Sequence, residues 1–257
     1  MKKIGILFLF LGLFTACSTT NIDTPSSYSS SSARETTDNS KELTEANILN
    51  NKGVNEYKRG DYKRAIYFFQ KSLAIKEQVL GTESLNTATS YNNIGLIYKQ
   101  NGDYEKALAY ITKALYIRKK SLGKRNSATA ESFNNLGTLY AKMGEKEKAI
   151  ALTEQTIKIK ESIIKKEKID TAISYNNLAV LQEEMGHYEK ALKGYKKALS
   201  INKEMYGKVH DVTQSNYQNI TLLYFTMHEY DKAKEYGQHL IKKEEMIRLK
   251  SIDVNAQ

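Results

Sequence analysis

Apolar and polar residues alternate along most of this chain with the spacing of α-helices, and the whole pattern recurs every 42 residues. In residues 87–100, apolar positions fall at i, i+3, i+4 and i+7, which is one face of a helix; they are Tyr91, Ile94, Gly95 and Tyr98. A turn containing Gly102 follows, and a second helical pattern begins near Asp103 and ends at about Leu122. Each copy is therefore predicted to be two helices joined by a tight turn.

Five copies keep one register. The turn glycine recurs in 42-residue steps as Gly60, Gly102, Gly144 and Gly186, and the fifth step falls on His228. One alanine of the second helix recurs in every copy, as Ala65, Ala107, Ala149, Ala191 and Ala233. A pair of helices cannot bury its own apolar face, so neighbouring pairs must stack. The pattern predicts an all-α solenoid of about five stacked helix-turn-helix repeats over residues 41–250, followed by a polar tail at 251–257.

Small and polar residues mark the helix contacts and the helix starts. Gly53, Gly95, Gly137 and Ala179 recur in one column and are expected to let the two helices of a pair approach closely. Threonines head the predicted first helices and are expected N-caps: Thr87, Thr129, Thr171 and Thr213. Lys52 departs from its apolar column, and the final stretch has Lys and Glu on faces that an inner repeat would bury, so the first and last copies are expected to be end caps.

The first sixteen residues are predicted to be a signal peptide. Two lysines precede an apolar run from Ile4 to Phe14, which is too short to span a bilayer and fits a secretory h-region. The run ends at Phe14-Thr15-Ala16-Cys17, which resembles the lipobox of bacterial lipoproteins, although leucine is usual where Phe14 stands. The resemblance implies cleavage before Cys17 and lipidation of its thiol. An ordinary signal with an incidental cysteine is the alternative.

This anchor would place the protein in the bacterial cell envelope, attached to a membrane through its lipid. Ser18 follows the cysteine, where an aspartate favours inner-membrane retention in lipoproteins of Gram-negative rods, so the outer membrane is expected if the host has one. Residues 17–40 are rich in Ser and Thr with few apolar residues, and we expect a disordered tether between lipid and folded domain.

The repeats resemble tetratricopeptide repeats (TPRs). The resemblance is carried by Gly95 at the helix crossing, Tyr98 one turn later, and Ala107 and Ala114 in the second helix. The 42-residue period, and the long connector at residues 121–137, resemble the kinesin-light-chain type of this family. The resemblance implies a right-handed solenoid whose first helices line a concave groove, and a function in protein–protein interaction.

Paired amides recur in the first helices, off the apolar stripe and on the side expected to face the groove. The residues predicted to face the groove are Asn51, Asn92, Asn93, Asn134, Asn135, Asn176, Asn177 and Asn219, with Leu96, Thr138 and Val180 beside them. An amide both donates and accepts, which suits the backbone of an extended peptide. In kinesin-light-chain-like repeats the matching asparagines contact bound peptide, which implies that role for Asn93, Asn135 and Asn177. Bridging between adjacent repeats is the alternative, and both roles can hold.

Charge and motif searches narrow the functional classes. The formal net charge is +10, and one basic cluster, formed by Arg118, Lys119, Lys120, Lys124 and Arg125, could meet an anionic surface or simply be a solvated helix end. No nucleophile motif, phosphate loop or metal-ligand cluster is present, and the four histidines are scattered. We expect no enzyme activity, cofactor, metal, small-molecule substrate or nucleic acid.

The combined expectation is a membrane-anchored, non-catalytic adaptor. It would hold a protein or peptide partner in its concave groove beside the membrane. The alternative is a structural assembly factor, or a pilotin-like factor, of an envelope machine that acts through the convex surface. The two hypotheses differ in which face of the solenoid is used.

Overall fold

The computed structural model describes residues 38–163 and 168–240, and within these ranges the chain forms ten helices and no strand. The helices are α1 Asp38–Lys58, α2 Tyr62–Leu80, α3 Leu85–Gln100, α4 Tyr104–Leu122, α5 Ser127–Lys142, α6 Lys146–Ser162, α7 Lys168–Glu184, α8 Tyr188–Tyr206, α9 Asp211–Thr226 and α10 Tyr230–Gly237. The predicted signal peptide, Cys17, the tether up to residue 37 and the tail lie outside the described residues. Helix α1 begins inside the last three residues of the predicted tether.

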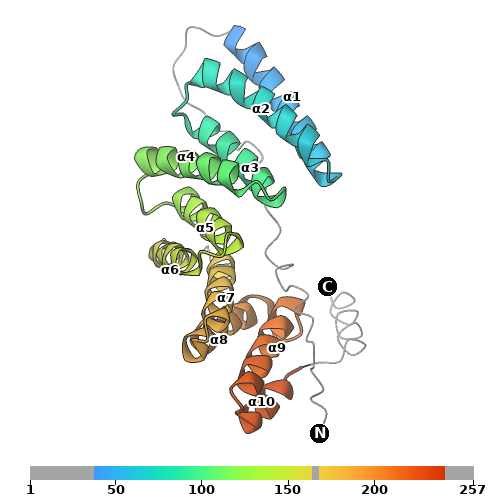
Figure 1. The fold of residues 1–257 in the computed structure, drawn as a ribbon, viewed down its shortest axis with the longest axis vertical. Helices are drawn as coiled ribbons and strands as arrows, with labels where there is room; N and C mark the ends of the chain where they lie inside the picture. The colour runs from blue at the N-terminus through green and yellow to red at the C-terminus, as the bar shows by residue number, and fades with distance from the viewer. Residues whose placement is uncertain (1–37, 164–167, 241–257) are drawn as a thin grey trace.

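The ten described helices form five antiparallel pairs that stack one on another into a solenoid (Figure 1). Each odd-numbered helix packs against the following even-numbered helix, and each pair packs on the next pair through the chain. This arrangement confirms the predicted all-α solenoid of five helix-turn-helix repeats, because the 42-residue sequence period becomes one pair of helices per step.

The turn within each repeat has the expected chemistry. Gly102 has φ of 83°, a left-handed value that costs glycine little, and the amide of Asp103 donates to the carbonyl of Tyr98. The side chain of Asp103 then accepts from the amide of Lys106 and so caps α4. His228 takes the glycine position in the fifth repeat with φ of 59°, a conformation that an L-residue other than glycine adopts at some cost.

The prediction that threonines cap the first helices is wrong. Helix α3 begins two residues before Thr87, and the side chain of Ser84 is the cap that accepts from the Thr87 amide. The hydroxyl of Thr87 instead donates to the carbonyl of Gly81 at 2.8 Å. Thr129 repeats this contact with Gly123, also at 2.8 Å. These threonines therefore tie the start of a first helix to the end of the preceding repeat.

Close packing within each repeat depends on the column of small residues. The repeated alanines of the second helices have no exposed surface in α2, α4, α6 and α8. A Cβ atom added at Gly95 would lie 2.6 Å from Cγ1 of Ile111. The fourth repeat has Ala179 in this column, and it faces Gly194, whose counterparts in the second and third repeats are the larger Tyr110 and Leu152. In the fourth repeat the glycine at the helix crossing therefore lies on the second helix instead of the first.

The apolar core is not one continuous cluster. One cluster runs through α2 to α5 around Phe69, Ile94 and Ile111, and another runs through α7 to α10 around Tyr195 and Ile220. A small third cluster joins α5 to α6. Helix α6, between the two large clusters, buries polar side chains on its inner face, namely Thr153, Thr156 and Lys160. The middle of the solenoid is therefore its least apolar part.

Candidate functional site

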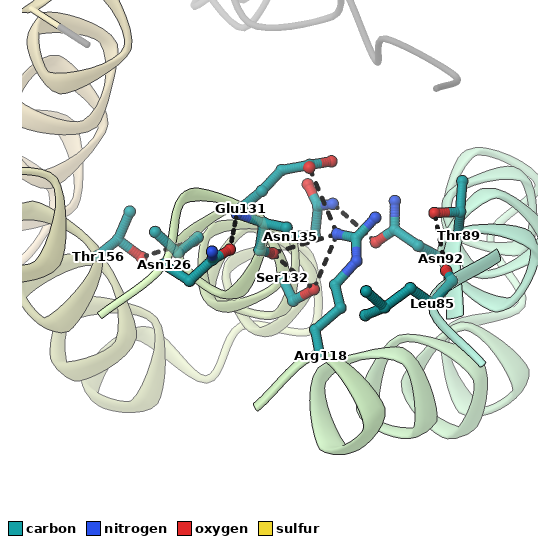
Figure 2. A network of polar contacts seen from close by, with 11 residues as sticks. Leu85, Thr89, Asn92, Arg118, Asn126, Glu131, Ser132, Asn135 and Thr156 are labelled. Atoms are coloured by element: carbon teal, nitrogen blue, oxygen red, sulfur yellow. Dashed lines mark hydrogen bonds and ion pairs between the residues drawn. The ribbon is translucent and has the colours of Figure 1, made fainter. Parts of the chain in front are cut away.

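The paired asparagines form bridges between neighbouring repeats. Asn135 of α5 donates from Nδ2 to Oδ1 of Asn92 in α3 at 2.9 Å (Figure 2). Asn219 of α9 makes the equivalent bond to Asn176 of α7 at 3.2 Å. In both cases the second amide of one repeat bonds to the first amide of the repeat before it. Each such bond contributes about 0.5–1.5 kcal/mol net to stability, so the amides hold the register of the stack at these two junctions.

The other predicted amides lie in different environments. Asn93 is fully buried in α3, and neither its Nδ2 nor its Oδ1 has a hydrogen-bond partner within the described part of the chain. Asn51 is exposed on α1, and Asn134 and Asn177 are half-buried. The bridging role is therefore present at two junctions, while contact of the amides with a bound peptide stays a prediction.

The apolar residues predicted to line the groove become more exposed towards the C-terminal end. Leu96 is buried in α3, and Val180 is half-buried in α7. Thr138 accepts a hydrogen bond from Nζ of Lys99 at 2.9 Å, which spans two repeats. In α9, Leu222 continues the column of Leu96, Thr138 and Val180, and Phe225 lies one turn further along; these two side chains are 48% and 62% exposed. The end of these columns at α9 is therefore an exposed apolar surface.

Acidic side chains lie on α7 just before this open end. Glu183 accepts a hydrogen bond from the Tyr195 hydroxyl at 2.7 Å, and burial raises the pKa of the Glu183 carboxyl above its ordinary value. Glu184 pairs with Lys146 of α6 at 2.9 Å. Phe225 itself packs edge-on against Tyr230 with ring centroids 5.2 Å apart. Both carboxylates are therefore engaged by residues of second helices, while Phe225 and Tyr230 present aromatic rings at the end of the solenoid.

The predicted basic cluster does not include Arg118. Its guanidinium is buried between α4 and α5, where it donates to the hydroxyl of Ser132 at 3.1 Å and to the carbonyl of Ala128 at 3.2 Å, and pairs with Glu131 at 3.3 Å (Figure 2). The backbone carbonyl and hydroxyl acceptors offset the cost of burying this charge. The remaining members are exposed, and Lys120 pairs with Glu83 at 2.5 Å.

Sequence reasoning missed a buried polar column that this arginine reveals. The column recurs every 42 residues at the end of the second helices and consists of Lys76, Arg118, Lys160 and Asn202, all at most 9% exposed. A second column lies 14 residues further along, and consists of Ser90, Ser132, Ser174 and Asn216. In three of the four pairs the two side chains are hydrogen-bonded to each other: Lys76 with Ser90, Arg118 with Ser132, and Asn202 with Asn216. The signal was available in the sequence as polar residues at fixed offsets on otherwise apolar faces.

Residues 38–163 and 168–240 contain neither a metal-ligand cluster nor a membrane-spanning helix. No group of histidine, cysteine, aspartate and glutamate side chains there could hold a metal ion. None of the described helices combines the length and apolar character needed to cross a membrane.

Comparison with solved structures shows the fold that this chain shares. A Podosopora anserina kinesin-light-chain protein with nearly identical TPR-like repeats is 17% identical with a TM-score of 0.67, over 76% of this chain and 92% of that one. BtubC from P. vanneervenii is 16% identical with a TM-score of 0.65, over 84% and 92%. A Rap protein in complex with the competence and sporulation factor is 19% identical with a TM-score of 0.59, over 76% and 52%.

No curated protein matches the sequence. The tetratricopeptide repeat family matches residues 44–115, 91–162 and 169–242, which together cover most of the chain. Solenoids of this kind are typically scaffolds for protein–protein interaction rather than catalysts. The chain belongs to the tetratricopeptide repeat family.

Proposed function

We propose that this chain is a lipid-anchored, non-catalytic scaffold that holds an extended segment of a partner protein in its concave groove at the cell envelope. The observation that carries the proposal is the open apolar end of the groove, where Leu222 and Phe225 are about half exposed or more. Large side chains exposed together on a concave surface are typical of an interaction site.

The energetics favour side-chain pockets as the main source of affinity. Ordering each residue of a peptide costs roughly 1–2 kcal/mol, while a net hydrogen bond returns about 0.5–1.5 kcal/mol. Amide contacts alone would barely offset the ordering. Burial of an apolar side chain against Leu222, Phe225 and Tyr230 would add about 25 cal/mol for each Å² removed from water. We therefore expect the partner segment to place a bulky apolar side chain at α9, with the amides fixing its direction.

Two further features support the proposal. The Rap protein among the similar solved structures was crystallised with the competence and sporulation factor, so a solenoid of this shape holds another molecule in that case. The lipobox-like sequence at Cys17 would attach the chain to a membrane, and a flexible tether of the predicted length would reach roughly 25–30 Å. A groove held at that distance would meet partners at the membrane surface.

Site-specific photo-crosslinking tests which face binds a partner. The crosslinking amino acid p-benzoylphenylalanine is placed at Val180 or Leu222 in the groove, and in matched controls at Tyr67 or Tyr116, which are more than half exposed on the second helices α2 and α4. The proposal expects one defined adduct from the groove positions in native cells and none from the controls. Adducts from the tyrosine positions alone would favour the assembly factor acting through the convex surface. Absence of any groove adduct would overturn the proposal.

A further inference from the structure

The exposed side of the second helices α2 and α4 is strongly basic. Its cations are Lys63, Arg64, Lys71, Lys106, Lys113, Lys119 and Lys120. Among the exposed residues of these two helices, Glu105 is the one carboxylate. The first helices α3 and α5 contain few charged residues, namely Lys99, Glu131 and Lys142. The positive charge of this part of the solenoid is therefore gathered on the side that faces away from the predicted groove.

Two exposed tyrosine rings lie among these cations. Tyr67 of α2 and Tyr116 of α4 are 56% and 57% exposed. Nζ of Lys71 lies 5.8 Å from the centroid of the Tyr67 ring, and Nζ of Lys120 lies 5.9 Å from that of Tyr116. Lys71 and Lys113 are one 42-residue period apart, so the exposed stripes of the two helices are on the same side of the solenoid. We call the seven cations and these two tyrosines the α2–α4 face.

The carboxylates near this face neutralise only part of it. The ion pairs are Lys106 with Asp103 at 2.7 Å, Lys113 with Glu77 at 3.8 Å, and Lys120 with Glu83 at 2.5 Å. In each pair both side chains keep at least 30% of their surface exposed. Exposed pairs of this kind are weak and are readily exchanged for other partners. The α2–α4 face therefore keeps a net positive charge that is available to an external anion.

The basic character stops at the third repeat. The exposed charged residues of α6 are nearly balanced in sign: Glu147, Lys148, Glu154, Lys158 and Glu161. The α2–α4 face is thus confined to the first two repeats, and the described chain begins in the first of them, at Asp38. These repeats are the ones that follow the predicted tether, so the basic face belongs to the part of the solenoid nearest the proposed lipid anchor.

We propose that the α2–α4 face docks on anionic lipid headgroups of the membrane that carries the anchor, so that the groove opens away from the lipid. All but one of its cations are lysines, which are point charges without the planar fork that favours individual carboxylates of a protein partner. A lysine near an anionic surface strengthens docking about fivefold. A tyrosine ring with its polar hydroxyl suits the boundary between lipid and water.

The lipid anchor makes weak docking sufficient. The tether would hold the solenoid within roughly 25–30 Å of the membrane, which converts docking into an intramolecular event. The proposal rests on the anchor of the proposed function, but it does not depend on what the groove binds. Anchoring and docking are therefore measured separately in the experiment.

The chain contains no tryptophan, so one introduced indole reports on one face. The variants Tyr67→Trp and Tyr116→Trp probe the α2–α4 face, and Phe225→Trp, at a position that is 62% exposed on α9, is the control. Each lipidated chain is extracted from membranes and reconstituted into vesicles that contain a headgroup-nitroxide lipid. The vesicles are either phosphatidylcholine alone or equal parts of phosphatidylcholine and phosphatidylglycerol.

Fluorescence of Tyr67→Trp and Tyr116→Trp should be quenched in the anionic vesicles and not in the neutral ones, and about 0.5 M sodium chloride should reverse the quenching. Phe225→Trp should behave identically in both. Equal quenching of all three variants would overturn the proposal. A chain that does not float with neutral vesicles refutes the lipid anchor of the proposed function, whereas a chain that floats without quenching refutes the docking alone.

Charge variants separate the face from the net charge of the chain. The triple substitution Lys63→Gln/Arg64→Gln/Lys71→Gln, made in Tyr116→Trp, should weaken docking about a hundredfold and abolish the quenching. The matched control Lys190→Gln/Lys193→Gln/Lys197→Gln removes the same charge from exposed positions of α8 and should preserve it. Equal loss in both would refute a specific face.

An acidic protein is the other class of partner that this charge could meet. If Tyr67→Trp is not quenched in anionic vesicles but polyglutamate shifts its emission in solution, the proposal is overturned and the face belongs to an acidic polypeptide.

Discussion

The substitution Gly95→Ala tests the close packing of the first and second helices of a repeat. The new Cβ would lie 2.6 Å from Cγ1 of Ile111 and 3.1 Å from the backbone nitrogen of that residue. A Cβ this close to backbone cannot be accommodated by a rotamer change alone. Gly137→Ala is the matched control at the same register position, because its nearest neighbours would be the Thr153 hydroxyl at 3.2 Å and Cβ of Leu152 at 3.4 Å.

The two substitutions share one favourable effect and differ in one unfavourable effect. Replacing glycine by alanine inside a helix stabilises by roughly 0.5–1 kcal/mol. Overpacking a tight contact costs typically about 1–3 kcal/mol. We expect Gly95→Ala to lower the free energy of unfolding by about 1–2 kcal/mol. Gly137→Ala should leave it unchanged or raise it by up to about 1 kcal/mol. The difference between the two variants isolates the contact with Ile111.

Urea denaturation followed by circular dichroism measures this difference as a shift in the midpoint. Thermal melting gives the same comparison, because about 1 kcal/mol corresponds to roughly 2–4 °C for a chain of this size. If Gly95→Ala proves as stable as Gly137→Ala, the helices separate without cost and the role given to the small-residue column is refuted.

Three further predictions concern single residues. Arg118→Met should lower the free energy of unfolding by about 1–3 kcal/mol, because the Ser132 hydroxyl and the Ala128 carbonyl lose their donor. The exposed control Lys119→Met should change it by less than about 0.5 kcal/mol. Equal melting temperatures of the two variants would contradict this prediction. Burial, with the hydrogen bond to Glu161, raises the pKa of Tyr175 to about 12. The contribution of this tyrosine to stability is therefore complete below pH 10 and is lost as pH rises from 10 to 12. In an ultraviolet titration, Glu161→Gln should lower the pKa of Tyr175. Cys17→Ser should abolish labelling by radioactive palmitate and release the protein from the membrane fraction, and a labelled, membrane-bound variant would contradict lipidation.

Most of the fold could be predicted from the sequence because the same pattern of residues recurs in each repeat. The 42-residue columns predicted the number of helix pairs, and Asp103 and Leu122 mark the second helix of the second repeat within one residue. The N-caps were missed because Ser84 and Asn126 precede the threonines by only three residues, and both residue types are good caps. The hydrogen bond from Thr87 to Gly81 spans two repeats, and helix-start patterns carry no information about such a partner.

The candidate site was only partly accessible for a related reason. The asparagine columns placed the amides in one row, but partner choice depends on distances between repeats. Asn92 and Asn135 meet, whereas Asn93 in the same pattern has no partner among the described residues. Arg118 was placed in the basic cluster because neighbouring lysines suggested a solvated helix end, and its burial depends on Ser132 and Ala128 of the next helix. Local sequence pattern shows which residues recur, and tertiary contact decides which of them are buried.

The division of the core into two large clusters has a consequence for how the solenoid opens. Repeat arrays unfold in units whose boundaries lie where the interface between neighbours is weakest. That boundary lies at α6, which stands between the two large clusters and carries Thr153 and Thr156 in place of bulky apolar residues on the face that packs on α5. Amide hydrogen exchange should therefore reveal two foldons, α1 to α5 and α7 to α10, that exchange by separate openings. A pull transmitted from a lipid-bound N-terminus would reach the first foldon before the second, so the open apolar end of the groove at α9 would stay folded under tension.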